Sequence, residues 1–200
     1  MKNIIIGIAI IAISAVACNN GSHKAAEKSE KKDDTTQVNN SKEKETDTSN
    51  KADAKVDGSM QEMVSQYLQM KNALANDNGK DAASAGNAFV ESMGKIEKTS
   101  LTTGKKKIWD DLSDDAKEMA EHIGKNAGDI EHQREHFDML SKDMYDMVKT
   151  FGAAQTLYQD FCPMYNDKKG AIWLSEIKEI KNPYLGKKMP TCGSVKEEIK

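Results

Sequence analysis

Apolar side chains recur at helical spacing along the middle of the chain. Between Met60 and Leu74 they are separated by three or four positions, which places them on one face of a helix. Ser59 precedes this face and Glu62 follows three residues later, the pattern of a capping box. Residues 76–79, which read Asn-Asp-Asn-Gly, are typical of a helix end. The pattern therefore predicts a first amphipathic helix that begins at Ser59.

Three further segments, residues 81–96, 105–125 and 130–151, carry the same kind of apolar stripe. The connections between these segments are short, and no strand pattern competes with them. Helices of this length with short connections favour an up-and-down arrangement. We therefore expect an all-α fold in which residues 58–152 form an antiparallel four-helix bundle.

Residues 153–200 differ in kind from the helical part. All three prolines of the protein lie here, together with glycines and short aromatic runs. Prolines and glycines interrupt regular elements and mark turns. We expect an irregular C-terminal segment of turns, one short helix near residues 175–180 and a small hairpin, packed on the bundle as part of the same domain.

The N-terminus, residues 1–17, carries the features of an export signal. Lys2 precedes an apolar run that is too short to span a bilayer, and the run ends in Ala15-Val16-Ala17-Cys18. Small residues before a cysteine at this point resemble a bacterial lipobox, which implies cleavage before Cys18 and lipidation of that residue. The alternative is ordinary secretion with an unpaired Cys18, which is unusual in exported proteins. We expect a lipid anchor in a membrane outside the cytoplasm, in the bacterial periplasm or at the outer membrane surface.

Residues 18–57 are dominated by charged and small polar side chains and contain no aromatic residue. Such a stretch cannot bury enough apolar surface to offset the entropy lost on ordering. It therefore reads as a disordered tether between the lipid anchor and the folded domain. The whole chain has 200 residues and a net charge of −3, so no basic excess points to a nucleic-acid partner.

Soft metal-ligand types gather in the C-terminal segment. Cys162 and Met164 lie near one end of it, and Met189 and Cys192 lie near the other. Thiolate and thioether groups select Cu(I) and similar soft ions over hard cations, so these four side chains are candidate ligands for copper or silver. In an oxidising compartment the two cysteines could equally form a disulfide. The residues alone leave both interpretations open.

Histidines supply a second set of candidate ligands. His132 and His136 are four residues apart on a predicted helix, so they share a face and can bind one metal ion. His122 lies near the end of the preceding helix, which places it at the same end of the bundle. The alternative is that all three are solvated helix residues.

Catalytic motifs are not recognisable. The pair His132 and His136 lacks the glutamate directly after the first histidine that zinc peptidases use. The sequence also shows no nucleophile motif and no glycine loop of the phosphate-binding type. We therefore expect a protein that is not an enzyme.

Three blocks of the sequence carry a family resemblance. They are residues 67–74, residues 132–141 with both helix histidines, and a tail with Cys162-Pro163-Met164, Asn182-Pro183-Tyr184 and Cys192-Gly193. Together they resemble a domain-of-unknown-function family of periplasmic proteins and lipoproteins. The same family is also found at the C-terminus of CusB-type copper/silver efflux adaptors. The resemblance covers residues 60–197.

The resemblance implies an all-helical domain and a link to copper or other heavy-metal handling. Its Cys-Pro-Met motif also looks like the short metal-binding motif of efflux adaptors. Leu185 and Pro190 depart from the family pattern, but neither is a metal-ligand type. The resemblance favours a copper or silver ion as the ligand, and a metal-efflux adaptor or another metal-handling protein as the partner.

Two functions are therefore expected. The first is a membrane-tethered lipoprotein that binds a soft metal ion, Cu(I) or Ag(I), through the cysteines and methionines with the histidines beside them. The second is a helical interaction module in which Cys162 and Cys192 form a structural disulfide and no metal binds.

Overall fold

The computed structural model describes residues 49–200, with side chains from Gly58 onward. The predicted export signal, the lipidation site at Cys18 and most of the predicted tether lie outside these residues. Within the described part, none of the helices combines the length and the apolar character needed to cross a membrane.

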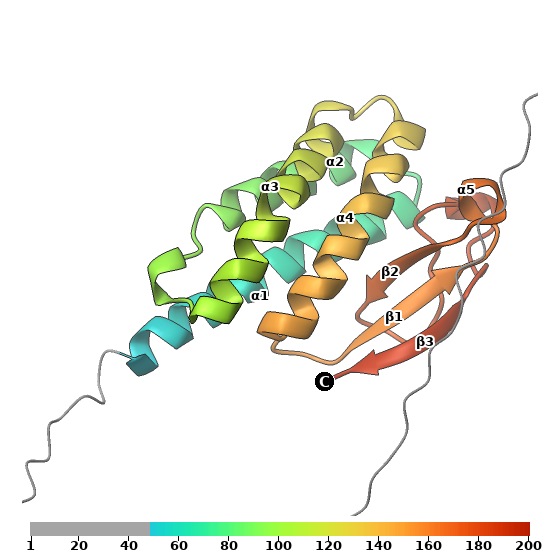
Figure 1. Ribbon diagram of the computed structural model, residues 1–200. Coiled ribbons are helices and arrows are strands. Elements are labelled where there is room, and N and C mark those ends of the chain that lie inside the picture. Colours follow the sequence, from blue (N-terminus) through green and yellow to red (C-terminus); the bar gives the residue numbers. More distant parts are fainter. Residues whose placement is uncertain (1–48) are drawn as a thin grey trace, which may run out of the picture. The chain divides into compact units, whose positions relative to one another are not determined.

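Four long helices make up most of the described chain (Figure 1). They are α1 (Ser49–Ala75), α2 (Gly79–Met93), α3 (Thr103–Lys125) and α4 (Ile130–Phe151), with one short 3-10 turn, η1 (Lys98–Ser100), between α2 and α3. Successive helices pack against one another, as the apolar stripes predicted. The four-helix part of the expected fold is therefore confirmed.

The first helix begins earlier than the capping pattern indicated. It starts at Ser49, so Ser59 lies inside α1 and is not its N-cap. Instead, the Ser59 hydroxyl donates to the carbonyl of Lys95 at 3.3 Å. The expected domain boundary at residues 57–58 therefore falls within a helix, because the polar residues before Ser59 continue the helical backbone without adding to the apolar stripe.

The C-terminal segment contains a small antiparallel sheet, so the expected all-α class is only roughly right. Its strands are β1 (Leu157–Cys162), β2 (Ala171–Ser175) and β3 (Ser194–Ile199), in the order β2-β1-β3. The segment also contains a four-residue helix, α5 (Tyr165–Lys168), and a 3-10 turn, η2 (Gly186–Lys188). Residues 176–179, where a short helix was expected, form a bend.

The antiparallel pair of β1 and β2 fits the small hairpin that was expected, but the positions of the strands and the third strand were not predicted, because the strands are short and their burial does not alternate. Trp173, Leu174 and Ser175 are all buried, since β2 packs on α4 and its side chains are covered on both faces. When a strand of five or six residues does not alternate between apolar and polar side chains, its sequence gives little sign of a strand. Its aromatic and β-branched residues were the remaining signal for a strand.

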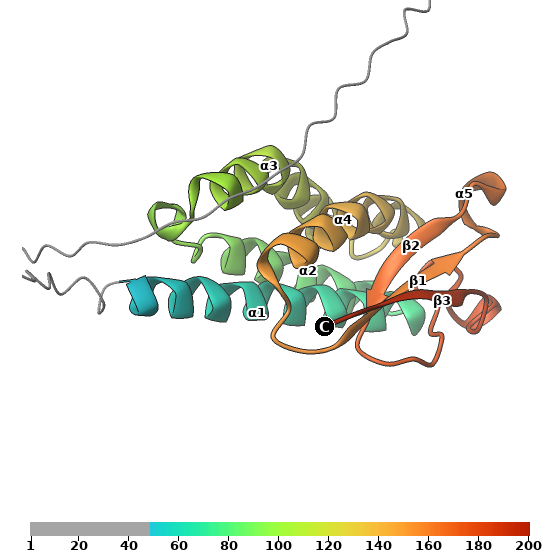
Figure 2. The same ribbon diagram turned by 60° about the horizontal axis from the view of Figure 1, so that its bottom comes forward.

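An abrupt reversal connects the helices to the sheet. Gly152 ends α4 with φ of 87°, in the left-handed region that favours glycine, and β1 then runs back along α4 (Figure 2). The loop after β1 returns to the first turns of α4, where Tyr165 and Asn166 line one groove with Glu131 and Glu135. The C-terminal segment is thus part of the same core as the helices.

Buried aromatic residues join the sheet to the helices. The ring of Phe137 stacks on Tyr67 of α1 at 5.0 Å and lies 5.9 Å from Tyr184. The Tyr67 hydroxyl accepts the Leu174 backbone N–H at 3.0 Å and shares a hydrogen bond of 2.8 Å with Ser141. Because these groups lie in the core, each bond restricts how β2 can sit on α1 and α4.

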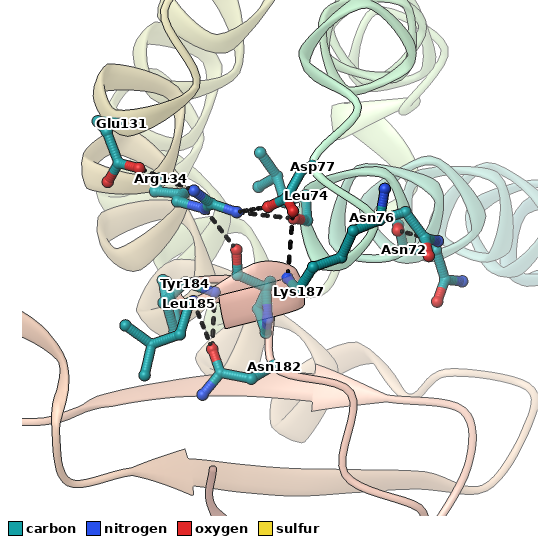
Figure 3. A network of polar contacts seen from close by, with 11 residues as sticks. Asn72, Leu74, Asn76, Asp77, Glu131, Arg134, Asn182, Tyr184, Leu185 and Lys187 are labelled. Carbon is teal, nitrogen blue, oxygen red and sulfur yellow. Dashed lines mark hydrogen bonds and ion pairs between the residues drawn. The ribbon is translucent and has the colours of Figure 1, made fainter. Parts of the chain in front are cut away.

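Arg134 makes a buried polar contact between the helices and the C-terminal segment (Figure 3). Its side chain is 5% exposed and donates to the carbonyls of Pro183 and Leu74 at 2.9 and 3.1 Å. It also pairs with Asp77 at 2.6 Å and with Glu131 at 2.9 Å. One guanidinium therefore holds the α1–α2 turn, α4 and the tail together.

The carboxylate of Asp77 completes this contact. Against the opposing effect of its partial burial, the hydrogen bonds from Arg134 and the Lys187 backbone lower the pKa of Asp77. Gly186, at φ of 51°, packs directly against this carboxylate, and a Cβ atom there would collide with it. The tail can approach the α1–α2 turn this closely only because residue 186 is glycine.

Replacing Arg134 tests how much this contact stabilises the fold. The variant Arg134→Met leaves two buried carbonyls without their donor and removes the ion pair of the partly exposed Asp77 carboxylate, so we expect a loss of about 2–4 kcal/mol in unfolding free energy. Urea unfolding of the full chain, followed by circular dichroism, measures this loss. Lys107→Met is the control, because Lys107 pairs with Asp111 on the exposed surface of α3. Similar losses for both variants would contradict the assignment.

Asp160 is a buried carboxyl group in the central strand. It is fully buried, and neither carboxylate oxygen makes a hydrogen bond of normal geometry. Burial raises its pKa to about 7, although Lys71 opposes the shift. Glu176, which pairs with Lys71 at 2.8 Å, adds to the rise. The folded protein therefore holds a proton on Asp160 that the unfolded chain releases at lower pH.

This proton makes stability depend on pH. Between the unfolded pKa of 3.8 and the folded value of about 7, the native state binds more protons, so stability falls as pH rises. Asp160→Asn removes this titration, and its stability relative to wild type should increase between about pH 4 and about pH 8. Urea unfolding across this range measures the trend, with Asp114→Asn at an exposed position of α3 as the control. A constant difference across the range would contradict the prediction.

Candidate metal centre

Three histidines from two neighbouring helices converge on one point. His132 and His136 lie one turn apart on α4, and His122 comes from the last turn of α3. Each offers a ring nitrogen, and these atoms all lie within 4.8 Å of one another. The Nε2 atoms of His132 and His136 are 3.0 Å apart, and the His122 ring stacks on His136 with centroids 4.2 Å apart.

The connection between α3 and α4 sets this arrangement. Asp129 caps α4 by accepting the backbone N–H of His132 at 3.1 Å. The Asn126 side chain donates to the His122 carbonyl at 2.7 Å, and buried Gln133 donates to the Ile123 carbonyl at 2.9 Å. These contacts fix the end of α3 against the start of α4, so His122 faces the two histidines of α4.

Each ring also has one nitrogen near a carboxylate or a thioether. His132 Nδ1 lies 3.7 Å from the Glu135 carboxylate, and His122 Nε2 lies 3.9 Å from that of Glu118. Both are ion-pair separations rather than hydrogen bonds. His136 Nδ1 lies 3.2 Å from the sulfur of Met119. Metal-binding histidines characteristically direct their second nitrogen at such partners, which orient the ring.

The electrostatics keep His136 in the form that a metal requires. Its partial burial lowers its pKa, and the neighbouring His122 and His132 rings lower it further. A lowered pKa means that the ring stays neutral at neutral pH, and only a neutral imidazole can bind a metal ion. All three histidines are half-buried, so solvent and small ions can reach them.

The separations between the ring nitrogens suit a single ion. Two nitrogens at about 2.0–2.1 Å from one tetrahedral metal lie roughly 3.3–3.4 Å apart. The distances in this cluster, from 3.0 Å up to 4.8 Å, bracket that value. Small rotations of the rings would therefore place all three nitrogens around one ion.

The two cysteines of the C-terminal segment also meet. Cys162 ends β1 and Cys192 precedes β3, and their sulfur atoms are 3.2 Å apart with both thiols free. Cys162 is fully buried, whereas Cys192 is half-buried. Burial raises the pKa of the Cys192 thiol, and the adjacent Cys162 raises it further.

The methionines expected beside these thiols point to the surface. Met164 is 48% exposed and Met189 is 40% exposed. Within residues 58–200, the histidines form the one group of at least three His, Cys, Asp or Glu ligand atoms, and it contains neither cysteine. The structure thus separates the expected ligands into a histidine cluster and a thiol pair. Whether either set binds a metal stays a prediction.

Met119 is the site residue that the sequence reasoning missed. Its position on the apolar stripe of α3 indicated core packing, and the half-buried side chain does pack against the core, but its sulfur also contacts His136. The available signal was its spacing, because Met119 lies three residues before His122 and so shares a helix face with it. An acidic groove of 590 Å³ also borders the cluster, with Glu135 and Met139 in its wall.

Comparison with known proteins gives a family but no function. No curated protein matches the chain, and no solved structure matches it. Residues 63–156 match the model of a family described as "Protein of unknown function (DUF3347)". This range contains the three histidines and Met119, whereas both cysteines of the thiol pair lie beyond it. The helical part of this chain, residues 63–156, is therefore similar to the family DUF3347.

Proposed function

We propose that this protein binds a metal ion through His122, His132 and His136. The observation that carries the proposal is the convergence of three ring nitrogens within 4.8 Å, from two helices, in a half-buried position. A solvated helix histidine needs no such partner. These three histidines meet, and each also has a ring nitrogen near a carboxylate or a thioether, so they resemble a set of metal ligands with supporting groups.

The facing nitrogens of His132 and His136 strengthen the proposal. If Nδ1 of His136 donates to Met119, Nε2 of that ring is left with a lone pair directed at His132. A proton on Nε2 of His132 would make the 3.0 Å contact an N–H···N hydrogen bond, whereas a proton on its Nδ1 would leave two lone pairs that face each other. Such an arrangement is repulsive unless a proton or a metal cation lies between the nitrogens.

Acidic side chains around the cluster favour a cation. Glu118 and Glu135 face two of the three rings, whereas Glu131 and Asp138 in the adjoining groove are paired with Arg134 and Lys142. Negative charge in and around a concave surface raises the local concentration of cations. The surroundings of the cluster are thus suited to attracting a metal ion from solution.

The proposed ion is copper, with silver as its soft analogue. Imidazole is a good ligand for copper, although it also suits zinc and nickel. The resemblance to a family associated with copper and silver efflux adaptors supports copper over the other two ions. A metal-efflux adaptor or another metal-handling protein is accordingly the proposed partner, and the proposed role is binding rather than catalysis.

The proposed location is a membrane surface outside the cytoplasm. It rests on the lipobox-like residues before Cys18 and on the polar composition of residues 18–57. A lipid on Cys18 and a long polar tether would hold the metal-binding domain near a bilayer without inserting it. Metal binding by the histidines does not depend on this anchor, so the two parts of the proposal can be tested separately.

Metal titration of histidine variants tests the proposed site. In a full-length Cys18→Ser, Cys162→Ser, Cys192→Ser background, no thiol can bind the probe ion. We expect Cu(I) to bind this protein with a 1:1 stoichiometry, and His132→Ala, His136→Ala to lower the affinity by at least about tenfold. Competition with a coloured Cu(I) chelator measures the affinity, and Ag(I) and Zn(II) serve as comparison ions.

His23→Ala is the matched control, because His23 is the remaining histidine of the chain and lies outside the described residues. Circular dichroism shows that each variant is folded. Equal affinities of the parent and the His132→Ala, His136→Ala variant would overturn the proposed site.

Met119→Leu tests whether the thioether orients His136. Leucine has a similar volume, so the fold should be retained, but it cannot accept the Nδ1 hydrogen bond. We expect a larger share of the ring nitrogen Nε2 to carry the proton, and a loss of roughly 10-fold in Cu(I) affinity. Nitrogen-15 NMR of the imidazole measures the tautomer, and the chelator competition measures the affinity. An unchanged tautomer would contradict the role given to Met119.

A further inference from the structure

The thiol pair formed by Cys162 and Cys192 is separate from the histidine cluster and is not used by the proposed metal site. The two sulfur atoms lie 3.2 Å apart, within the roughly 3–3.5 Å at which reacting atoms are held in a near-attack arrangement. Both residues have free thiols. The geometry therefore presents one sulfur to the other without a rearrangement of the chain.

Regular backbone structure holds Cys162 in place. It is the last residue of β1 and pairs with Ala171 of β2, while its neighbour Phe161 pairs with Ser194 of β3. Cys162 is fully buried in the core. Its sulfur is thus fixed in position and shielded from solvent.

The loop before β3 holds Cys192 from the other side. The Asn182 side chain donates to the Cys192 carbonyl at 2.6 Å, and the Asn182 backbone N–H donates to Pro190 at 2.9 Å. Gly193 then takes φ of 145° and packs so closely on Trp173 that a Cβ atom would lie 2.9 Å from the ring. These contacts keep the Cys192 sulfur against Cys162, so the meeting of the two thiols is built into the sheet.

The two thiols differ in access to solvent. Cys192 is half-buried, whereas Cys162 has no exposed surface. Among the described residues, no group of three or more His, Cys, Asp or Glu ligand atoms includes either of them. An external reagent can therefore approach Cys192 first, and the sulfur within reach of Cys192 is that of Cys162.

We propose that Cys162 and Cys192 are a redox-active dithiol that is closed to a disulfide by exchange with a small external disulfide. Cys192 is the attacking thiol and Cys162 is the resolving thiol. The chemical class of the co-reactant is a low-molecular-weight disulfide, such as oxidised glutathione or cystine. This assignment is independent of metal binding by the histidines.

The exchange balances in two steps. The Cys192 thiolate attacks one sulfur of the external disulfide, whose S–S bond breaks, and a mixed disulfide on Cys192 and one free thiolate result. The Cys162 thiolate then attacks the Cys192 sulfur, the mixed disulfide breaks, and a second thiolate leaves. The protein loses two electrons and two protons, and the external disulfide is reduced to two thiols.

Single-cysteine variants give the sharpest test of this order. The full chain with Cys18→Ser is incubated with oxidised glutathione, and intact-protein mass spectrometry follows the products. We expect the parent to lose the mass of two hydrogen atoms as the disulfide closes. Cys162→Ser should instead accumulate one glutathionyl group on Cys192. Cys192→Ser should remain unmodified, because Cys162 is buried.

Two measurements keep the test informative if a serine variant folds poorly. In the reduced parent, peptide mapping after brief alkylation should show Cys192 modified before Cys162. The oxidised parent should also unfold at a higher urea concentration than the reduced parent, because the closed loop restricts the unfolded chain. The proposal is overturned if the parent stops at a mixed disulfide or keeps both thiols, or if Cys162 reacts before Cys192. These outcomes do not depend on the result of the metal titration of the histidine variants, so the two proposals can fail separately.

Discussion

The buried guanidinium of Arg134 is the interaction on which the rest of the described structure depends. It lies on α4 between the two helix histidines in sequence, but it points to the opposite side of the helix, toward the α1–α2 turn and Pro183. Residues 132 and 136 share a face because they are four apart, whereas residue 134 projects about 200° away from residue 132. Three hydrogen bonds from Arg134 to other elements on one side of α4 therefore favour one rotation of the helix, and that rotation turns His132 and His136 toward His122.

Two chemically different clusters are built on this frame. The histidine cluster belongs to the α3–α4 hairpin, and short capping contacts between the two helices position it. The thiol pair belongs to the sheet, where β1 and the loop before β3 bring distant residues together. The buried hydroxyls of Tyr67, Ser141 and Tyr184 connect the two regions through the core. Each cluster is thus held by contacts within its own part of the fold, and the histidines and the thiols do not form one site.

The sequence predicted the helices well because amphipathic periodicity is a local property. The ends of helices were harder, as Ser59 shows, because a capping pattern inside a longer helix looks the same as one at its start. Only a small hairpin was expected and its strands were not located, because β1 and β2 are short and β2 is covered on both faces, so neither shows the alternation that marks a half-exposed strand. Met119 was assigned to the core for a related reason, since an apolar stripe does not show which of its members border a polar cluster.

By itself, the sequence determined the helical character of residues 58–152, the shared face of His132 and His136, and the presence of soft ligand types in the tail. These properties follow from spacing along the chain, and spacing is preserved in any tertiary arrangement. Only the tertiary structure decided that His122 and Met119 join the helix pair, and that Cys162 meets Cys192 while both stay apart from the histidines. The physical reason is that contacts between elements depend on how α4 is rotated and where β1 returns, and both are set by buried contacts far away in the sequence.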